Sequence, residues 1–279
     1  MELRGPFKNK LFLTAVVSVV VALIFAAIII LPNLMKPLLD YELSSDGSYY
    51  VLTSWCATNE KETEVEVPSV YKGVPVKVIG QTGEDAPFNK VNWLFLEDRY
   101  IKSVILPSSI ERIEVFNDDA ENNRANVQRI DINSEVLEIK ALAFSGMNIQ
   151  ELNFLNIKSL KADGFGRVAE LNYYCSIETL CSFELGRTYF DKVYINNEEI
   201  TQLIIPTDVE RIGTAVFFNW DCLETVYIPS TVKSVGEDAF GECDNLDLIL
   251  YEGTIEEWRD ICEGYYEVKV KCTDGTIIS

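Results

Sequence analysis

The chain offers few residue types that commonly carry out enzyme chemistry. It has 279 residues and no histidine, which excludes Ser/His/Asp and Cys/His catalytic units, histidine-ligated metal sites and an imidazole pH switch. Its 44 acidic residues include many possible carboxylate pairs for glycoside cleavage, but with so many some pair lies at any given separation. P-loop, G-x-G-x-x-G, G-x-S-x-G and EF-hand sequences are missing. We therefore expect no enzyme activity, no catalytic residues and no cofactor.

One acidic segment could bind a metal ion. Residues 117–126 read NDDAENNRAN, and Asp118, Asp119 and Glu121 could supply oxygen ligands to Ca²⁺. A run of this kind is more commonly a solvated loop, and neither a glycine nor the ligand spacing of a known calcium loop is present. We predict no metal site and leave Ca²⁺ binding in this loop as the alternative.

The seven cysteines allow two interpretations. An odd number does not suit a complete disulfide framework, and a small apolar thiol packs well in a core, so buried free thiols are favoured. Cys243, at an inward position of a repeat described below, is an example. The pairs Cys175/Cys181 and Cys262/Cys272 remain candidates for disulfides, with Cys56 left unpaired. None of the cysteines has the CxxC spacing of a structural metal site.

The charge distribution divides the chain into two parts. The net charge of −20 would repel a phosphate backbone, so we expect no nucleic acid partner. Residues 1–36 nevertheless carry four basic residues against one acidic residue, a net charge of +3. The change of sign coincides with one long apolar run.

That apolar run, residues 11–31, predicts a transmembrane helix. It reads LFLTAVVSVVVALIFAAIIIL and as a helix would span about 31 Å, the thickness of a bilayer's hydrocarbon core. A cleaved signal peptide is the alternative, but the run exceeds the ~7–15 apolar residues of such peptides and no A-x-A triplet closes it. The basic residues before the run place the N-terminus in the cytoplasm. We predict a cytoplasmic basic tail at 1–10, a single-pass anchor at 11–31, a linker at 32–40 and an extracellular C-terminal part at the cell membrane.

An internal repeat dominates the remainder of the chain. Nine positions from Leu203 to Leu223 recur 23 residues later, from Val226 to Leu246, with matching chemistry. Weaker copies lie upstream, at Val104, Leu106, Pro107, Ile110, Ile113 and Phe116 and at Ile130, Ile132, Val136, Ile139, Ala143 and Phe144. Further degenerate copies, each shortened by a residue or more, run Leu152, Phe154, Leu160 and Phe165, and Leu171, Tyr173, Ile177, Leu180 and Leu185.

Each repeat has a physical interpretation as one coil. The V-x-I-P element alternates with period two and predicts a short strand that the proline ends. Further along, we expect Gly213 and Gly236 to supply a positive φ at the corner, while the Phe217 and Phe240 rings fill the core. No unit can bury its apolar face alone, so the units must stack about 4.8 Å apart as a solenoid, with Ile205 beside Ile228 on adjacent parallel strands.

The most regular unit resembles a known repeat. Residues 223–243, LETVYIPSTVKSVGEDAFGEC, are similar to the leucine-rich repeat of the BspA type, whose unit reads L-x-x-V-x-I-P-x-x-V-x-x-I-G-x-x-A-F-x-x-C. Residues 50–80, 193–206, 251–261 and 272–277 resemble the opening element, the hairpin insertion and the ending of that family. Units between 117 and 190 depart from the pattern. The resemblance implies a mainly β leucine-rich repeat solenoid with short helical turns, and a role in attachment and recognition at the cell surface.

Local signals predict how the solenoid begins and ends. Asp46-Gly47 and Asn196-Asn197 are hairpin turn signals between apolar runs. Thr254 and Glu257 form a capping box for a short helix that presents Trp258, Ile261 and Cys262 on one face. We expect an N-terminal β cap and first repeat at 41–100, the repeat solenoid at 101–250 and a C-terminal cap at 251–279.

The strand positions that point away from the core predict the binding face. If Val226 and Ile228 point inward, the intervening residues point outward. The outward residues expected to form one continuous ladder are Ser103, Ile105, Arg129, Asp131, Glu151, Asn153, Gln202, Ile204, Thr225 and Tyr227. Apolar and aromatic side chains at such positions either merely suit a strand or mark an interface.

Two functions follow from these expectations. The first is a membrane-anchored extracellular binding or adhesion module that recognises a protein or glycan partner through its strand face. The second is a structural or scaffold component of a membrane-associated assembly.

Overall fold

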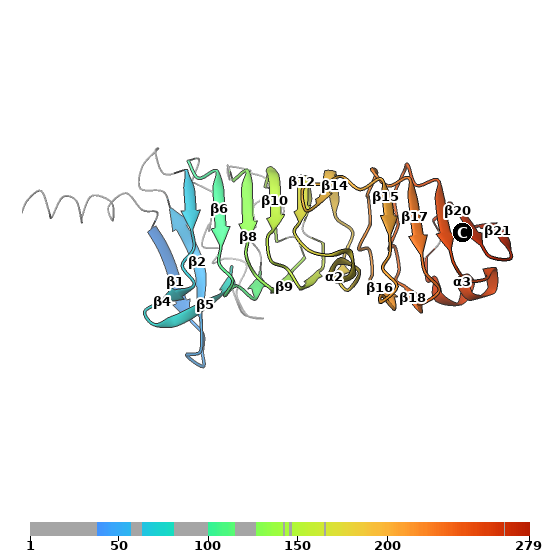
Figure 1. Ribbon diagram of the computed structural model, residues 1–279. Helices are drawn as coiled ribbons and strands as arrows, with labels where there is room; N and C mark the ends of the chain where they lie inside the picture. The colour runs from blue at the N-terminus through green and yellow to red at the C-terminus, as the bar shows by residue number, and fades with distance from the viewer. Residues whose placement is uncertain are drawn as a thin grey trace, which may run out of the picture.

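Successive repeats stack as coils of an elongated solenoid, with strands following one another in chain order along its axis (Figure 1). The computed structural model describes residues 38–56, 63–80, 100–114, 127–141, 143–144, 147–164, 166–264 and 266–279. The mainly β solenoid predicted from the repeat is confirmed.

Parallel sheets form the long faces of the solenoid. The six-stranded sheet contains, in spatial order, β14 (Tyr189–Ile195), β12 (Arg167–Tyr173), β10 (Ile149–Phe154), β8 (Arg129–Ile132), β6 (Ser103–Leu106) and β3 (Glu64–Glu66). The five-stranded sheet contains β15 (Gln202–Ile204), β17 (Thr225–Ile228), β19 (Leu248–Tyr251), β20 (Lys269–Cys272) and β21 (Gly275–Ile278). Within each sheet the strands run parallel, except that β21 is antiparallel to β20.

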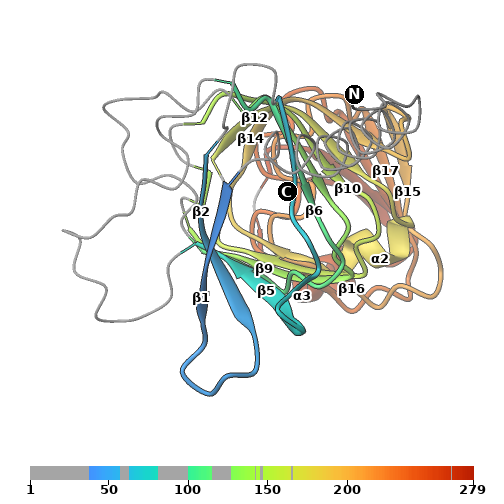
Figure 2. The ribbon, with the colours of Figure 1, turned by 90° about the vertical axis from the view of Figure 1, so that its left-hand side faces the viewer.

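Two further sheets form the opposite side of the coils, as the end view shows (Figure 2). The eight-stranded sheet contains β1 (Leu38–Leu43), β2 (Tyr50–Cys56), β5 (Val74–Ile79) with β4 (Val70–Tyr71) beside it, β7 (Arg112–Ile113), β9 (Val136–Ile139), β11 (Ser159–Ala162) and β13 (Glu184–Leu185). A two-stranded sheet pairs β16 (Arg211–Ile212) with β18 (Ser234–Val235). The helices among the described residues are short: α2 (Ile177–Cys181) and α3 (Ile255–Ile261).

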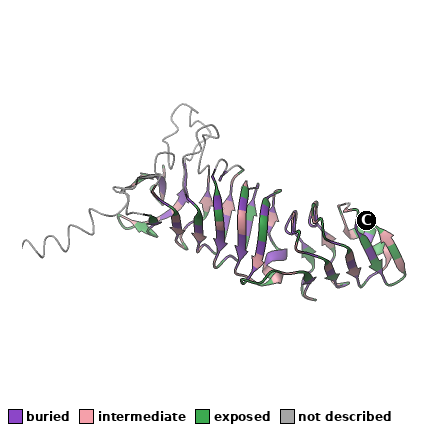
Figure 3. Ribbon diagram, turned by 90° about the horizontal axis from the view of Figure 1, so that it is seen from above, coloured by how far each residue is buried: buried purple, intermediate pink, exposed green. Residues whose placement is uncertain are grey.

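The inward strand positions form one continuous core (Figure 3). Leu203 pairs with Val226, which pairs with Ile249, and all three are fully buried. Ile205 directly follows β15 and donates its amide hydrogen to the Tyr227 carbonyl, beside Ile228 at the end of β17, and both isoleucines are buried, so the predicted stacking is confirmed. The Phe217 and Phe240 rings stack with centroids 5.4 Å apart.

Two details of the repeat differ from prediction. Gly213 and Gly236 do not have a positive φ; instead, a Cβ at Gly236 would lie 2.7 Å from the Thr214 nitrogen of the preceding coil, and one at Gly213 would overlap the Phe183 carbonyl oxygen. Close backbone approach therefore requires these glycines. Val136, assigned to the core, is 60% exposed, because β9 alternates so that Leu137 and Ile139 point inward.

The predicted turns and the C-terminal helix are confirmed. The β1–β2 hairpin turns at Asp46-Gly47, and Asn196 and Asn197 turn with positive φ between bridged Ile195 and Glu198. Helix α3 begins with the capping box of Thr254 and Glu257 and buries Trp258 against the core.

The predicted tail at 1–10, helix at 11–31 and most of the linker at 32–40 lie outside the described residues, and β1 already begins at Leu38. Within the ranges that the structure covers, no helix is long and apolar enough to cross a bilayer.

Candidate functional site

The predicted binding-face residues all lie on strands, but on two different sheets. Ser103, Ile105, Arg129, Asp131, Glu151 and Asn153 belong to β6, β8 and β10 of the six-stranded sheet, whereas Gln202, Ile204, Thr225 and Tyr227 belong to β15 and β17 of the five-stranded sheet. The expectation of one continuous ladder is therefore wrong. After β14 the chain turns at Asn196-Asn197. The edge of β14 does not pair with β15; there the Phe190 carbonyl accepts a hydrogen bond from the Asn219 side chain.

Parallel pairing arranges the outer face of the six-stranded sheet in two rows. The first row runs Glu64, Ser103, Arg129, Glu151, Glu170 and Lys192, and the second runs Glu66, Ile105, Asp131, Asn153, Asn172 and Tyr194. The members on β3, β12 and β14 were not among the residues predicted from sequence. Alternation around the inward Leu171 and Tyr173 would have identified Glu170 and Asn172.

A directional chain of hydrogen bonds joins the second row. The Asn172 Nδ2 donates to Asn153 Oδ1 at 2.8 Å, and Asn153 Nδ2 donates to Asp131 Oδ1 at 2.7 Å. The Arg129 guanidinium donates to Asp131 at 3.0 Å and to Glu151 at 2.9 Å. These bonds bury Asn153, which the sequence analysis expected to be exposed, to 3% exposure. The hydrogen bond to Asp131 raises the pKa of Arg129.

A groove of about 320 Å³ lies over this end of the six-stranded sheet. Its walls include Asn172, Tyr174, Tyr194 and Asn197, together with residues of the hydrogen-bonded chain. The Tyr174 hydroxyl donates to Asn197 Oδ1 at 2.7 Å, which fixes that ring against the Asn196-Asn197 turn. The groove therefore combines fixed amides and carboxylates with tyrosine side chains.

The outer face of the five-stranded sheet has a different chemistry. Its outward strand positions are Gln202, Ile204, Thr225, Tyr227, Leu248, Leu250, Lys269, Lys271, Thr276 and Ile278. None of these ten described positions carries a carboxylate, although the chain has 44 acidic residues. The two lysines instead make this face locally basic.

An apolar groove of about 450 Å³ lies on this five-stranded face. Ile204, Tyr227 and Leu250 line it, with Lys271 at one side and Glu252 beyond the strand ends. Ile204 is 62% exposed and Tyr227 is 38% exposed. Large apolar side chains grouped on a surface, rather than scattered singly, are typical of an interface.

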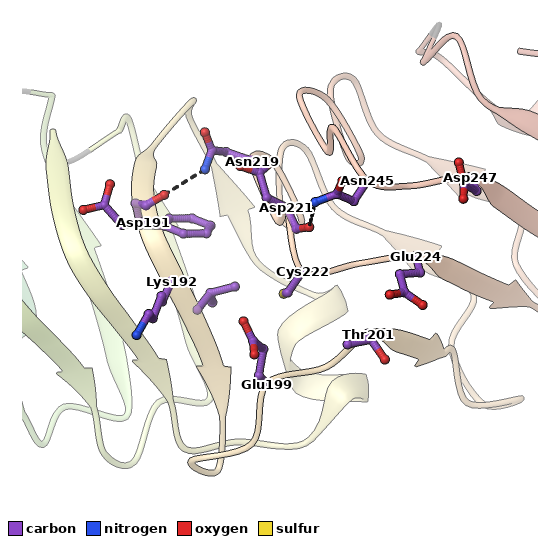
Figure 4. A pocket seen from close by; sticks show the side chains of 12 residues that line it. Asp191, Lys192, Glu199, Thr201, Asn219, Asp221, Cys222, Glu224, Asn245 and Asp247 are labelled. Atoms are coloured by element: carbon purple, nitrogen blue, oxygen red, sulfur yellow. Dashed lines mark hydrogen bonds between the residues drawn. The ribbon is translucent and has the colours of Figure 1, made fainter.

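An acidic cleft marks the place where the two sheets separate (Figure 4). It has a volume of about 470 Å³, and its carboxylates come from Asp191, Glu199, Asp221, Glu224 and Asp247. Lys192 is the one cationic side chain among the described residues that line it. The carboxylates are spread over the cleft, and no group of three or more Cys, Asp or Glu residues in the described part of the chain could hold a metal ion.

The described cysteines are free thiols. Neither Cys175 and Cys181 nor Cys262 and Cys272 form the disulfides considered from sequence, because all four are unpaired. Burial raises the pKa of Cys175, Cys181 and Cys243 to about 12, so these thiols stay protonated and unreactive near neutral pH. The Cys243 Sγ donates to the Phe217 carbonyl at 3.0 Å. The acidic loop at 117–126, considered for Ca²⁺, lies outside the described residues.

Comparison with solved structures finds other leucine-rich repeat proteins. The leucine rich repeat protein of T. pallidum (TpLRR) is 19% identical, with a TM-score of 0.36, over 81% of this chain and 83% of that one. A leucine rich cell surface protein from Faecalibacterium prausnitzii is 18% identical, with a TM-score of 0.35, over 85% of this chain and 57% of that one. The pneumococcal vaccine antigen PcpA is 11% identical, with a TM-score of 0.32, over 77% and 72%.

Among curated proteins, no sequence matches this chain. A family model does match: the BspA type leucine rich repeat region, six copies, aligns with residues 91–182 and 187–262. These residues make up more than half of the chain and contain most of the coils described above. The chain therefore belongs to the BspA type leucine rich repeat family.

Proposed function

We propose that the chain is a membrane-anchored, outward-facing binding module that recognises a protein partner through the outer face of the five-stranded sheet. The observation that carries this proposal is the lack of carboxylates at the ten outward positions of that sheet, in a chain of net charge −20. Exposed apolar residues such as Ile204 and Tyr227, together with the two lysines, occupy this face, and they favour contact with another molecule.

The chemistry of this face indicates what the partner presents. The groove at Ile204, Tyr227 and Leu250 fits apolar side chains, since these contacts exclude water and an exposed tyrosine is a common interface anchor. Lys269 and Lys271 are exposed on the adjacent strand and favour carboxylates beside the apolar group. We therefore expect an apolar protein segment flanked by acidic residues.

The anchor and the location belong to the same proposal. The apolar run at 11–31 would fix the chain in the cell membrane, with the N-terminus in the cytoplasm and the solenoid outside. In this arrangement the module binds its partner and catalyses no reaction. A scaffold role within a membrane assembly is the alternative, and it differs in that the partner would come from the same membrane.

The test begins with the full-length chain in the membrane of whole cells. A photo-reactive phenylalanine analogue at position 227 should form a covalent adduct with the partner, whereas the same group at Lys161, on the eight-stranded sheet, should not. The purified partner is then titrated against the full-length chain and its Ile204→Ser variant in lipid nanodiscs. The substitution should weaken binding by about tenfold or more. Adhesion predicts a partner from host or matrix material, and the scaffold role predicts one from the same membrane.

The matched control is Val136→Ser. Val136 is 60% exposed and Ile204 is 62% exposed, both are β-branched strand residues, and they lie on opposite sides of the solenoid. Val136→Ser should leave the affinity unchanged. Equal affinity of the two variants, or adducts at Lys161 but not at position 227, would remove the five-stranded face from the proposal.

A further inference from the structure

We propose that the outer face of the six-stranded sheet carries a second binding site, for a neutral glycan, centred on Asn172 and Tyr194. This site lies in the groove of about 320 Å³ described above. It is on a different sheet from the protein-binding face, and neither proposal depends on the other.

The hydrogen-bonded chain fixes a polar group in a binding orientation. Asn172 is 9% exposed and uses Nδ2 to donate to Asn153, which in turn donates to Asp131. The direction of this chain leaves the Asn172 carbonyl Oδ1 as an acceptor, and no described residue donates to it. Because the amide is held before a ligand arrives, little side-chain entropy is lost on binding.

Polar and aromatic groups suited to a sugar surround that acceptor. Asn172 pairs with Tyr194 on the neighbouring strand, and Tyr174, held by Asn197, lies at the strand end. Glu170 on the same outer face adds a carboxylate acceptor. A sugar ring presents hydroxyls around its edge and an apolar C–H face, so it can bond the amide and carboxylate while it packs on a tyrosine ring.

Charge selects a neutral ligand. Three carboxylates, on Asp131, Glu151 and Glu170, face two cations, on Arg129 and Lys192. Arg129 is already bonded to Asp131 and Glu151, and Lys192 lies 3.8 Å from Glu170, so neither cation is free for an anion. An acidic sugar or a phosphate would meet net negative charge.

Spacing argues against an extended peptide along the rows. Equivalent residues on adjacent strands are about 4.8 Å apart, whereas side chains on one face of an extended peptide recur about every 6.7 Å. The side chains of a peptide lying across the strands would therefore not recur in step with the coils.

The test is calorimetric titration of the full-length chain in lipid nanodiscs with short neutral oligosaccharides of glucose, mannose or galactose. Oligogalacturonides of the same length serve as acidic counterparts. At least one neutral series should bind, and its acidic counterpart should not. Asn172→Ala and Tyr194→Ala should each weaken binding by about tenfold or more.

Two controls separate this site from loss of fold and from the protein-binding face. Tyr227→Ala removes an equivalent aromatic ring from the five-stranded sheet and should leave glycan affinity unchanged. Tyr194→Ala affects a partly exposed side chain, so it tests the site even if Asn172→Ala fails to fold. Absence of binding by all neutral series, equal binding of acidic sugars, or wild-type affinity in Tyr194→Ala would each overturn the proposal.

Discussion

At Gly213 and Gly236 the neighbouring coil occupies the space in which a side chain would stand. The Gly236 amide donates to the Ile212 carbonyl at 2.9 Å, which draws the two backbones together at the corner. The three atoms nearest to a Cβ at Gly236 are backbone atoms of the preceding coil, so a side-chain rotation cannot move them away. The two regular units therefore need glycine at this position because space for a side chain is lacking, and not because the backbone adopts a positive φ.

Gly236→Ala should lower the free energy of unfolding by about 1–3 kcal/mol because it overpacks the corner. Denaturant titration would measure the change. Gly275→Ala is the matched control, since its Cβ would approach only the flexible Ile255 Cδ1, and it should change stability by less than about 0.5 kcal/mol. Asn tolerates positive φ but needs more room, so a tolerated Gly236→Asn would contradict the steric explanation.

The strand pairs and the stacked rings behind them hold one coil to the next. β15 and β17 are joined by three residue pairs, and β16 and β18 by two, so the backbone contacts per coil are few. The Phe217 and Phe240 rings, parallel to within 5° and almost fully buried, supply the apolar contact between these coils. The packing of neighbouring units, rather than any single strand, is therefore what stabilises each element.

Phe217→Ala should lower the free energy of unfolding by about 3–5 kcal/mol, because it leaves a cavity between two coils. Ile204→Ala, on the same unit but 62% exposed, should stay within about 0.5 kcal/mol of the wild type. Thermal melts of both variants measure the difference. Similar melting temperatures for the two would show that the Phe217 ring contributes little to coil stacking.

Terminal elements cover the C-terminal end of the solenoid. At the C-terminal end, β20 covers the edge of β19, while Trp258 and Tyr266 contact the rings of Tyr251 and Phe240.

The eight-stranded sheet carries a row of alternating charges across the coils, which runs Arg112, Glu138, Lys161 and Glu184 and ends on the ion pair between Glu184 and Arg211. Opposite charges on neighbouring strands favour this strand register over shifted pairings.

A chain that ends after Glu252 should have a lower melting temperature than the full-length chain, bind a hydrophobic dye and self-associate. Removal of α3, β20 and β21 exposes the edge of β19 and the apolar end of the core, which terminal units of solenoids normally cover. Calorimetry and size-exclusion chromatography, with full-length Glu252→Gln as the control, would measure these changes. A monomeric truncated chain with an unchanged melting temperature would show that the cap is dispensable.

By itself, the sequence determined the coil. The 23-residue period, the inward apolar positions and the turn residues are local properties, and a unit that cannot bury its own apolar face has to stack on a neighbour. Prediction from sequence therefore identified the solenoid, the core positions of Phe217 and Phe240, the capping box at Thr254 and the strand positions of the predicted face residues, but it joined those strands in a single ladder. The prediction failed at Val136 because side chains alternate strictly along β9, so that Leu137 and Ile139 point inward and Val136 points outward. The repeat pattern instead places apolar residues three positions apart.

The tertiary structure alone decided how the outer surface is divided. Whether β14 pairs with β15 depends on where the Asn196-Asn197 turn sends the chain, and this splits the predicted ladder into two sheets. The burial of Asn153 depends on Asp131 and Asn172, which lie 22 and 19 residues away in sequence. The contrast between a polar, amide-lined groove and a face without carboxylates arises only when residues from separate coils lie side by side, because neither surface belongs to any one repeat.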